Sequence, residues 1–143
     1  MELRDRYLAC IAHDRMKETL LSCLRRHRAT LAGLSLIATG TTGRLIREQL
    51  GLNVKCVQSG PLGGDQQIGS EIAGGRVGAV IFLRDPLYAH PHESDVSAFM
   101  RLCDVYNVPL ATNRASAELV LSSLAASRSV RRPRSARGTR VSS

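Results

Sequence analysis

One pattern recurs five times along the chain: a short run of apolar and β-branched residues that passes directly into polar or glycine-rich sequence. The runs cover residues 7–12, 34–38, 54–57, 77–83 and 108–111. They are mostly apolar rather than alternating, which is typical of strands buried on both faces of a parallel sheet. Such a sheet needs helices on both sides, and this requirement constrains the fold more than any other feature.

Helical patterns fill the gaps between these runs. Apolar residues recur at helical spacing between residues 16 and 24, 45 and 50, 68 and 75, 96 and 105, and 119 and 124. The alternation of strand and helix predicts a single doubly wound α/β domain with a parallel sheet of about five strands. The pattern leaves the order of the strands open.

Charge divides the chain into two parts. Residues 1–124 hold all 12 acidic residues and 14 of the 20 lysines and arginines, a net charge of +2. Residues 125–143 hold six arginines and no acid, in a composition that cannot build a core. We therefore expect an α/β domain at residues 1–124 and a flexible tail at residues 125–143. The tail is either simply solvated or contacts nucleic acid or another polyanion weakly.

Several features indicate a cytoplasmic protein. The longest apolar run, residues 77–83, is far shorter than the about 20 residues that span a bilayer. The N-terminus is charged and has no apolar signal core. The four cysteines are scattered, without the paired spacing of zinc or redox motifs, as in a protein of a reducing compartment.

Polar residues directly after each predicted strand are the candidate site, because ligands of open α/β sheets bind at the carboxyl ends of the strands. In chain order these residues are His13, Asp14 and Lys17, then Thr39, Gly40, Thr41, Thr42 and Gly43, then Ser59 to Gln67, then Asp85, His92 and Asp95, and finally Thr112 and Asn113. Their positions predict a single site along one edge of the sheet.

Two glycine-containing loops have two interpretations each. Residues 39–43 form either an ordinary helix-capping turn or a phosphate cradle at a helix N-terminus. They lack the Gly-Lys-Ser/Thr ending of a nucleotide-binding P-loop. Asp65 is either a helix N-cap or a working carboxylate that the preceding glycines bring close to a ligand. Gln66 and Gln67 add amide groups beside it.

The histidines also allow two interpretations. His13 with Asp14, and His92 with Asp95, are either caps and first-turn residues or acid/base pairs. His27 has no such neighbours, and we expect it at the surface. Asp85, at a strand end, is either a turn former or a carboxylate that supports the site.

Together these motifs resemble those of the methylglyoxal synthase family. The matching blocks follow the family's order and comprise residues 12–14 with Lys17, residues 38–43, residues 59–67, residues 81–87, Pro91 and His92 with Asp95, and residues 109–113. The combination of Thr-Gly-Thr-Thr-Gly with Gly-Gly-Asp-Gln-Gln is the specific part of this resemblance. It covers roughly residues 7–124.

The resemblance implies conversion of dihydroxyacetone phosphate to methylglyoxal and inorganic phosphate, with no metal and no organic cofactor. It also implies a cytoplasmic homohexamer built on a flavodoxin-like parallel sheet. By motif, Asp65 would be the catalytic base, with His92 and Asp95 in the catalytic set. The substrate-binding set would be His13, Asp14, Lys17, Thr39, Gly40, Thr41, Thr42, Ser59, Gly60 and Asp85.

Two other functions compete with this one. A regulatory domain that binds a small phosphorylated effector would keep the cradle but not need the base, so Asp65, His92 and Asp95 favour the enzyme. A nucleic-acid module would work through the arginines of residues 125–143. The rest of the chain, residues 1–124, has few aromatic residues on which bases could stack. The tail also departs from the family, whose members continue with an ordered C-terminal segment that includes an arginine.

Overall fold

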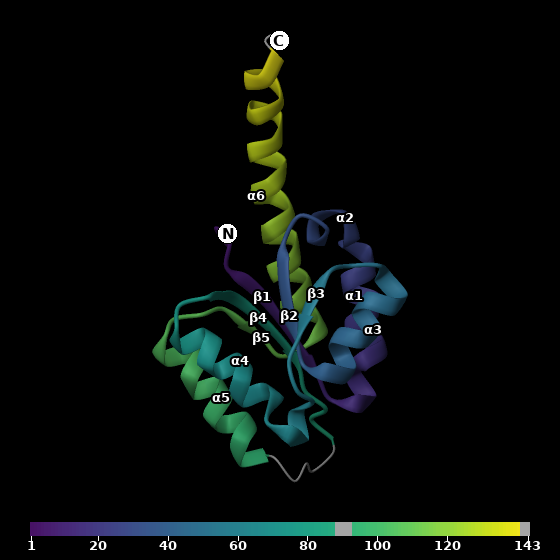
Figure 1. The fold of residues 1–143 in the computed structure, drawn as a ribbon, viewed down its shortest axis with the longest axis vertical. Coiled ribbons are helices and arrows are strands. Elements are labelled where there is room, and N and C mark those ends of the chain that lie inside the picture. The colour runs from purple at the N-terminus through teal and green to yellow at the C-terminus, as the bar shows by residue number, and fades with distance from the viewer. Residues whose placement is uncertain (88–92, 141–143) are drawn as a thin grey trace.

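The computed structural model describes the backbone of residues 1–87 and 93–140 and the side chains of residues 1–87 and 96–127. It contains a five-stranded parallel sheet between two layers of helices (Figure 1), as the strand pattern predicted. The strands are β1 (Tyr7–Ala12), β2 (Ser35–Ala38), β3 (Val54–Cys56), β4 (Val77–Leu83) and β5 (Leu110–Ala111). The predicted doubly wound α/β class is confirmed.

The order of the strands, which the sequence left open, is β3-β2-β1-β4-β5. The chain moves outward from β1 to β2 and β3, and then crosses to the other side of β1 to form β4 and β5. The direction therefore reverses between β1 and β4. In doubly wound sheets, the carboxyl ends of the strands at such a reversal border a crevice where ligands bind.

Helices and short 3-10 turns connect the strands. In chain order they are a 3-10 turn (Asp14–Met16), α1 (Lys17–Arg26), α2 (Arg28–Leu31), α3 (Gly40–Leu50), a 3-10 turn (Gly60–Leu62), α4 (Gly64–Ala73), α5 (Glu93–Val105) and α6 (Arg114–Arg140). Helix α3 ends at Gly51, whose φ of 66° is the left-handed conformation of a glycine C-cap.

Two apolar clusters hold the layers to the sheet. Side chains of successive strand residues point to opposite faces, and β1 shows this directly. Leu8 and Cys10 pack with α1, α3 and α6, while Ala9 and Ile11 pack with α4 and α5. Figure 1 shows the same division, with α4 and α5 on one side of the sheet and α1 and α3 on the other. All seven residues of β4 are buried, as its continuous apolar run predicted.

Helix α6 continues into the segment that the composition predicted as a tail. The predicted helix at residues 119–124 is part of a longer one, and the backbone stays helical to Arg140 and extends beyond the sheet (Figure 1). Alanine and arginine, which are frequent in this segment, are strong helix formers even where no core is available. Leu124 is the last buried residue among the described side chains. The domain boundary at this position stays a prediction.

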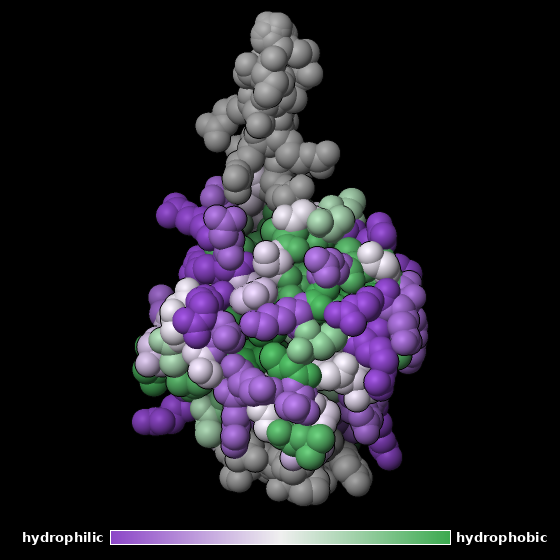
Figure 2. All heavy atoms as spheres, in the orientation of Figure 1, coloured by the Kyte–Doolittle hydropathy of each residue, from purple (hydrophilic) through white to green (hydrophobic). Residues whose placement is uncertain are grey.

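The surface is mixed. Figure 2 shows charged and polar side chains around the outline of the body and apolar side chains that reach the surface nearer its centre. Leu62 and Leu87 are 72% and 91% exposed, in the loops after β3 and β4. Within the part of the chain that the structure describes, no helix combines the length and the apolarity that crossing a membrane requires.

Candidate active site

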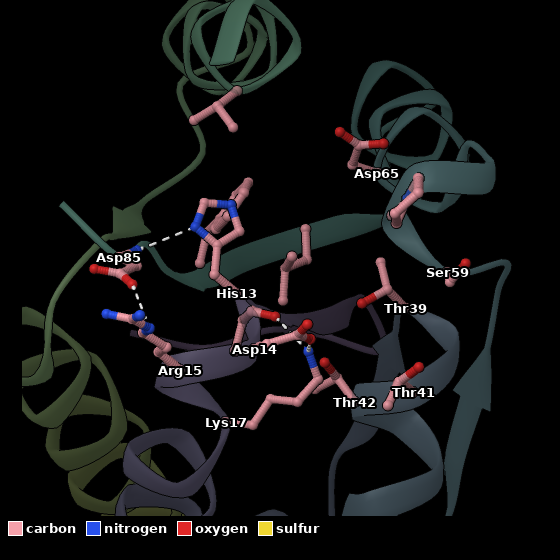
Figure 3. A pocket seen from close by; sticks show the side chains of 16 residues that line it. His13, Asp14, Arg15, Lys17, Thr39, Thr41, Thr42, Ser59, Asp65 and Asp85 are labelled. Atoms are coloured by element: carbon pink, nitrogen blue, oxygen red, sulfur yellow. Dashed lines mark hydrogen bonds and ion pairs between the residues drawn. The ribbon is translucent and has the colours of Figure 1, made fainter. Parts of the chain in front are cut away.

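A pocket of about 400 Å³ opens at the carboxyl edge of the sheet, above the reversal between β1 and β4 (Figure 3). Ten residues of the predicted catalytic and substrate-binding sets line it: His13, Asp14, Lys17, Thr39, Thr41, Thr42, Ser59, Gly60, Asp65 and Asp85. His92 and the side chain of Asp95 lie outside the described residues. The structure therefore brings together side chains from the ends of four strands.

Lys17 reaches the pocket from the first turn of α1. Its ammonium nitrogen donates to the carbonyl oxygen of Ala12 at 3.0 Å and to the carboxylate of Asp14 at 2.8 Å. An ammonium group has three N–H donors, so these two bonds leave one for a ligand. The Lys17 side chain is only 15% exposed, while that of Asp14 is 98% exposed. Asp14 thus holds the cation from the solvent side.

His13 is oriented by a residue far away in the sequence. Its Nδ1 accepts a hydrogen bond of 3.1 Å from the main-chain N–H of Asp85, and its ring meets Phe82 edge-on with centroids 5.5 Å apart. A main-chain N–H can only donate, so Nδ1 carries no proton, and Nε2 carries the proton of the neutral ring. His13 therefore offers a donor, at Nε2. No side-chain capping bond from His13 is present.

Asp85 supports this arrangement from a buried position, with 9% of the residue exposed. Its Oδ1 accepts a hydrogen bond from the Leu87 N–H at 3.1 Å, which shapes the turn after β4. Its Oδ2 faces the guanidinium of Arg15 at 3.9 Å. The bond to Leu87 fits the predicted turn-forming role of Asp85, and its supporting role in a site stays a prediction. Arg15 also lines the pocket, although it was not predicted from the sequence. Its position directly after His13 and Asp14 could have indicated it.

The start of α3 forms a polar wall of the pocket. Thr39 is at the N-cap position but makes no side-chain capping bond, so the cap interpretation is wrong for its hydroxyl. Thr42 is 2% exposed, and its Oγ1 has no hydrogen-bond partner among the described residues. A buried hydroxyl without a partner is unfavourable, unless a ligand supplies one. The N–H groups of Thr41 and Thr42 belong to a first helical turn, which has no intrahelical acceptors for them.

Gly40, predicted as a substrate contact, has a different place. It is absent from the described pocket lining. Its N–H donates to the carbonyl oxygen of Gln58 at 3.2 Å. A Cβ at this position would lie 3.2 Å from the oxygen of Val57 and from the nitrogen of Ser59. Gly40 thus allows α3 to start against the main chain that follows β3.

Asp65 enters the pocket from the first turn of α4, across from Lys17 in Figure 3. The two preceding glycines have separate tasks: Gly63 has a φ of 97°, and a Cβ on Gly64 would lie 1.8 Å from the Gln58 oxygen. The N-cap of α4 is Gly63, so Asp65 is the second residue of the helix and not its N-cap. Its Oδ1 accepts only the adjacent N–H of Gln66, at 3.0 Å, among the described hydrogen bonds. The N-cap interpretation of Asp65 is therefore wrong.

Apolar side chains complete the pocket. Ile11, Phe82 and Val96 line it beside the polar residues. These walls reduce the water in contact with Asp65 and His13, which strengthens electrostatic interactions inside the pocket. A partly desolvated carboxylate, a neutral imidazole donor and a cation beside a helix N-terminus can together move a proton and hold an anion.

Other reactive groups lie outside the pocket. Cys10, Cys23 and Cys103 are buried and Cys56 is exposed; burial raises the pKa of the Cys10 thiol to about 12, so this thiol stays protonated. The described residues contain no group of three or more His, Cys, Asp or Glu side chains placed to hold a metal ion.

The prediction of His27 as a surface residue is wrong. Its side chain is 15% exposed, and its Nε2 lies 2.9 Å from Oε1 of Glu118 on α6. The partner lies 91 positions away in the sequence, so no local pattern indicates the contact. The pair joins the end of α1 to α6.

Comparisons with known proteins agree with this fold and pocket. A family model described as an MGS-like domain matches residues 20–112. The methylglyoxal synthase of Clostridium botulinum (strain Alaska E43 / Type E3) is 54% identical over 114 residues, covering 80% of this chain and 96% of that protein. The methylglyoxal synthase of Natranaerobius thermophilus is 56% identical over 117 residues, covering 82% of this chain and 98% of that protein.

A solved structure is also similar. The crystal structure of methylglyoxal synthase from Elizabethkingia anophelis NUHP1 matches with a TM-score of 0.77 and 52% identity, covering 82% of this chain and 77% of that chain. The fold and the pocket therefore define a doubly wound α/β enzyme of the MGS-like class. Within this class, the chain belongs to the methylglyoxal synthase family and is a lyase.

Proposed function

We propose that this enzyme converts dihydroxyacetone phosphate to methylglyoxal and inorganic phosphate. One observation carries the proposal: a carboxylate, Asp65, faces a pocket whose other walls hold the Lys17 ammonium group and the N-terminus of α3. A triose phosphate has an acidic C–H bond at one end and a dianion at the other. The two ends of the pocket match these two chemical demands.

In the first step, Asp65 removes a proton from the hydroxymethyl carbon of the substrate. The electron pair of the broken C–H bond forms a carbon–carbon double bond, and negative charge develops on the former carbonyl oxygen. A well-placed general base contributes about 10²–10⁴ in rate. The apolar walls near Asp65 favour this transfer by limiting its hydration.

His13 stabilises the developing oxyanion. Because the Asp85 N–H occupies Nδ1, the ring presents its Nε2–H to the pocket. A donor of this kind stabilises the charge without giving up its proton. His92 and Asp95, assigned from sequence alone, complete the catalytic set in this proposal.

In the second step, the carbon–oxygen bond to phosphate breaks. The terminal hydroxyl gives its proton to the leaving phosphate and becomes the aldehyde carbonyl, while the carbon–carbon double bond shifts to the carbon that carried phosphate. Phosphate leaves with the bonding pair as the hydrogen phosphate dianion. The remaining enolate takes up the proton held by Asp65 at its methylene carbon, which gives methylglyoxal and restores the carboxylate. Lys17, Thr41 and Thr42 hold the leaving dianion by charge and by helix N–H groups. Elimination requires the breaking bond to stand out of the enediolate plane, and in this proposal residues 39–42 with Ser59 and Gly60 set that torsion.

The proposal includes the assembly and compartment that the family resemblance implies, a cytoplasmic homohexamer. Size measurement in solution tests this part separately from the activity.

The activity is tested by incubating the purified full chain with dihydroxyacetone phosphate and measuring methylglyoxal and inorganic phosphate together. We expect both products in equal amounts. Binding of inorganic phosphate with no turnover would instead favour the regulatory domain considered above.

A further inference from the structure

Gln67 of the Gly-Gly-Asp-Gln-Gln block is not explained by the chemistry above. It was expected beside the carboxylate of Asp65, yet it is absent from the described pocket lining. Instead its side-chain oxygen Oε1 accepts a hydrogen bond of 2.8 Å from the main-chain N–H of Gln58. The bond connects α4 to the segment that follows β3.

That segment lies between the starts of two helices. On one side the Gly40 N–H of α3 donates to the Gln58 oxygen at 3.2 Å, and on the other the Gly64 N–H of α4 donates to the Ser59 oxygen at 2.9 Å. Gly64 is required, because a Cβ there would lie 1.8 Å from the Gln58 oxygen, and Gly40 is closely packed, since a Cβ there would lie 3.2 Å from the Ser59 nitrogen. Main chain packs directly on main chain at both helix starts.

Gln67 completes this connection. The carbonyl of Gln58 is held by α3 and its N–H by Gln67 of α4, so both polar groups of one peptide residue tie the two helices together. Helix α3 carries Thr41 and Thr42, while α4 carries Asp65 two residues before Gln67. The link therefore lies between the helix that carries the proposed anion-binding residues and the helix that carries the proposed base.

We propose that Gln67 is a positioning residue that sets the phosphate-binding loops relative to Asp65. The proposal rests on the proposed function. It concerns the second step more than the first, because proton removal depends on Asp65 and the oxyanion donor His13, whereas only elimination depends on the phosphate torsion. Losing the link therefore lowers phosphate elimination more than proton exchange.

The chain offers a matched set of variants. Gln67→Met removes the acceptor oxygen and keeps the side-chain length. Gln67→Ala is a second variant without the acceptor oxygen. Gln67→Glu keeps an acceptor oxygen. Gln66→Met makes the same change one residue earlier, on an exposed side chain outside the described pocket lining.

The experiment measures four quantities for each full-length variant: methylglyoxal release, exchange of the substrate C–H in deuterated water, inhibition by inorganic phosphate, and the melting temperature. One hydrogen bond of this kind changes an equilibrium by roughly 2- to 10-fold. We expect Gln67→Met and Gln67→Ala to weaken phosphate inhibition by that factor and to lower the ratio of elimination to exchange. Gln67→Glu and Gln66→Met retain the parent ratio.

Two outcomes overturn the positioning role. One is a ratio of elimination to exchange in Gln67→Met and Gln67→Ala that equals the ratio in Gln66→Met. The other is a fall in this ratio that Gln67→Glu shows to the same extent. Both differ from failure of the proposed function, in which the parent enzyme itself releases no methylglyoxal.

Discussion

The main-chain N–H of Asp85 donates a 3.1 Å hydrogen bond to Nδ1 of His13, across 72 positions of sequence. The bond joins the ends of the two neighbouring strands β1 and β4, where the chain reverses its direction across the sheet. It fixes both the orientation of the imidazole and the nitrogen that carries its proton. The orientation of this imidazole thus follows from the order of the strands.

This bond makes a direct prediction about His13. At neutral pH, the nitrogen NMR signals of its ring should show a protonated Nε2 and an unprotonated Nδ1. His13→Ala removes the oxyanion donor, and we expect kcat to fall by about 10²-fold or more, the magnitude typical of such donors. A proton on Nδ1 would contradict the assigned role.

Thr42→Val separates stability from activity. The Thr42 hydroxyl is buried and has no partner among the described residues, so its replacement by an isosteric methyl group should leave the free energy of unfolding unchanged or raise it slightly. The same change should lower methylglyoxal release by about tenfold and spare proton exchange. Urea unfolding and the deuterium assay measure the two effects. Equal losses in release and exchange would argue against the torsion role of residues 39–42.

Gly64→Ala tests the approach of α4 to the segment after β3. The added Cβ would lie 1.8 Å from the Gln58 oxygen, and main chain cannot move aside cheaply, so we expect a loss of about 3 kcal/mol in the free energy of unfolding. Gly60→Ala is the stability control, because nothing lies within 4 Å of its added Cβ. Denaturant unfolding that gave equal stabilities for the two variants would mean that the close approach is absent.

The Glu118 carboxyl should make the free energy of unfolding depend on pH. The hydrogen bond from His27, with the nearby Arg26, holds the pKa of the Glu118 carboxyl below its ordinary value of 4.5. A carboxyl whose pKa is lower in the folded state stabilises the fold above its unfolded pKa, and this contribution is lost as pH falls through the folded pKa. Glu118→Gln should therefore be less stable than the parent at pH 7, with a smaller difference near about pH 3.

Urea unfolding at the two pH values measures this effect. Glu48→Gln, on an exposed position of α3, is the control and should show no such change. If the stability difference for Glu118→Gln stayed constant across the range, the ion pair would contribute nothing that depends on ionisation.

The strands were predictable because their signal is local. Residues 7–12 and 77–83 match β1 and β4 to the residue, since a strand buried on both faces needs a continuous apolar run. The clustering of Lys17, Thr42 and Asp65 around one pocket was predictable for a related reason. Parallel strands bring the residues after their carboxyl ends to one edge, whatever the order of the strands.

What the sequence missed depends on contacts between distant residues. The strand order, the bond from Asp85 to His13 and the pair of His27 with Glu118 each join segments far apart in the chain. The family motif assigns Gly40 to the substrate contacts, and a Gly-rich turn has the same sequence whether it faces a ligand or another piece of main chain. Only the position of Gln58 distinguishes the two.

Asp65→Asn removes the base on which the proposed reaction depends. The amide keeps the shape of the side chain and an oxygen for the Gln66 N–H, but cannot take a proton from carbon. Methylglyoxal release and substrate proton exchange should both fall by at least about 10²-fold, with an unchanged melting temperature. A folded Asp65→Asn enzyme that released methylglyoxal at the rate of the parent would contradict the account.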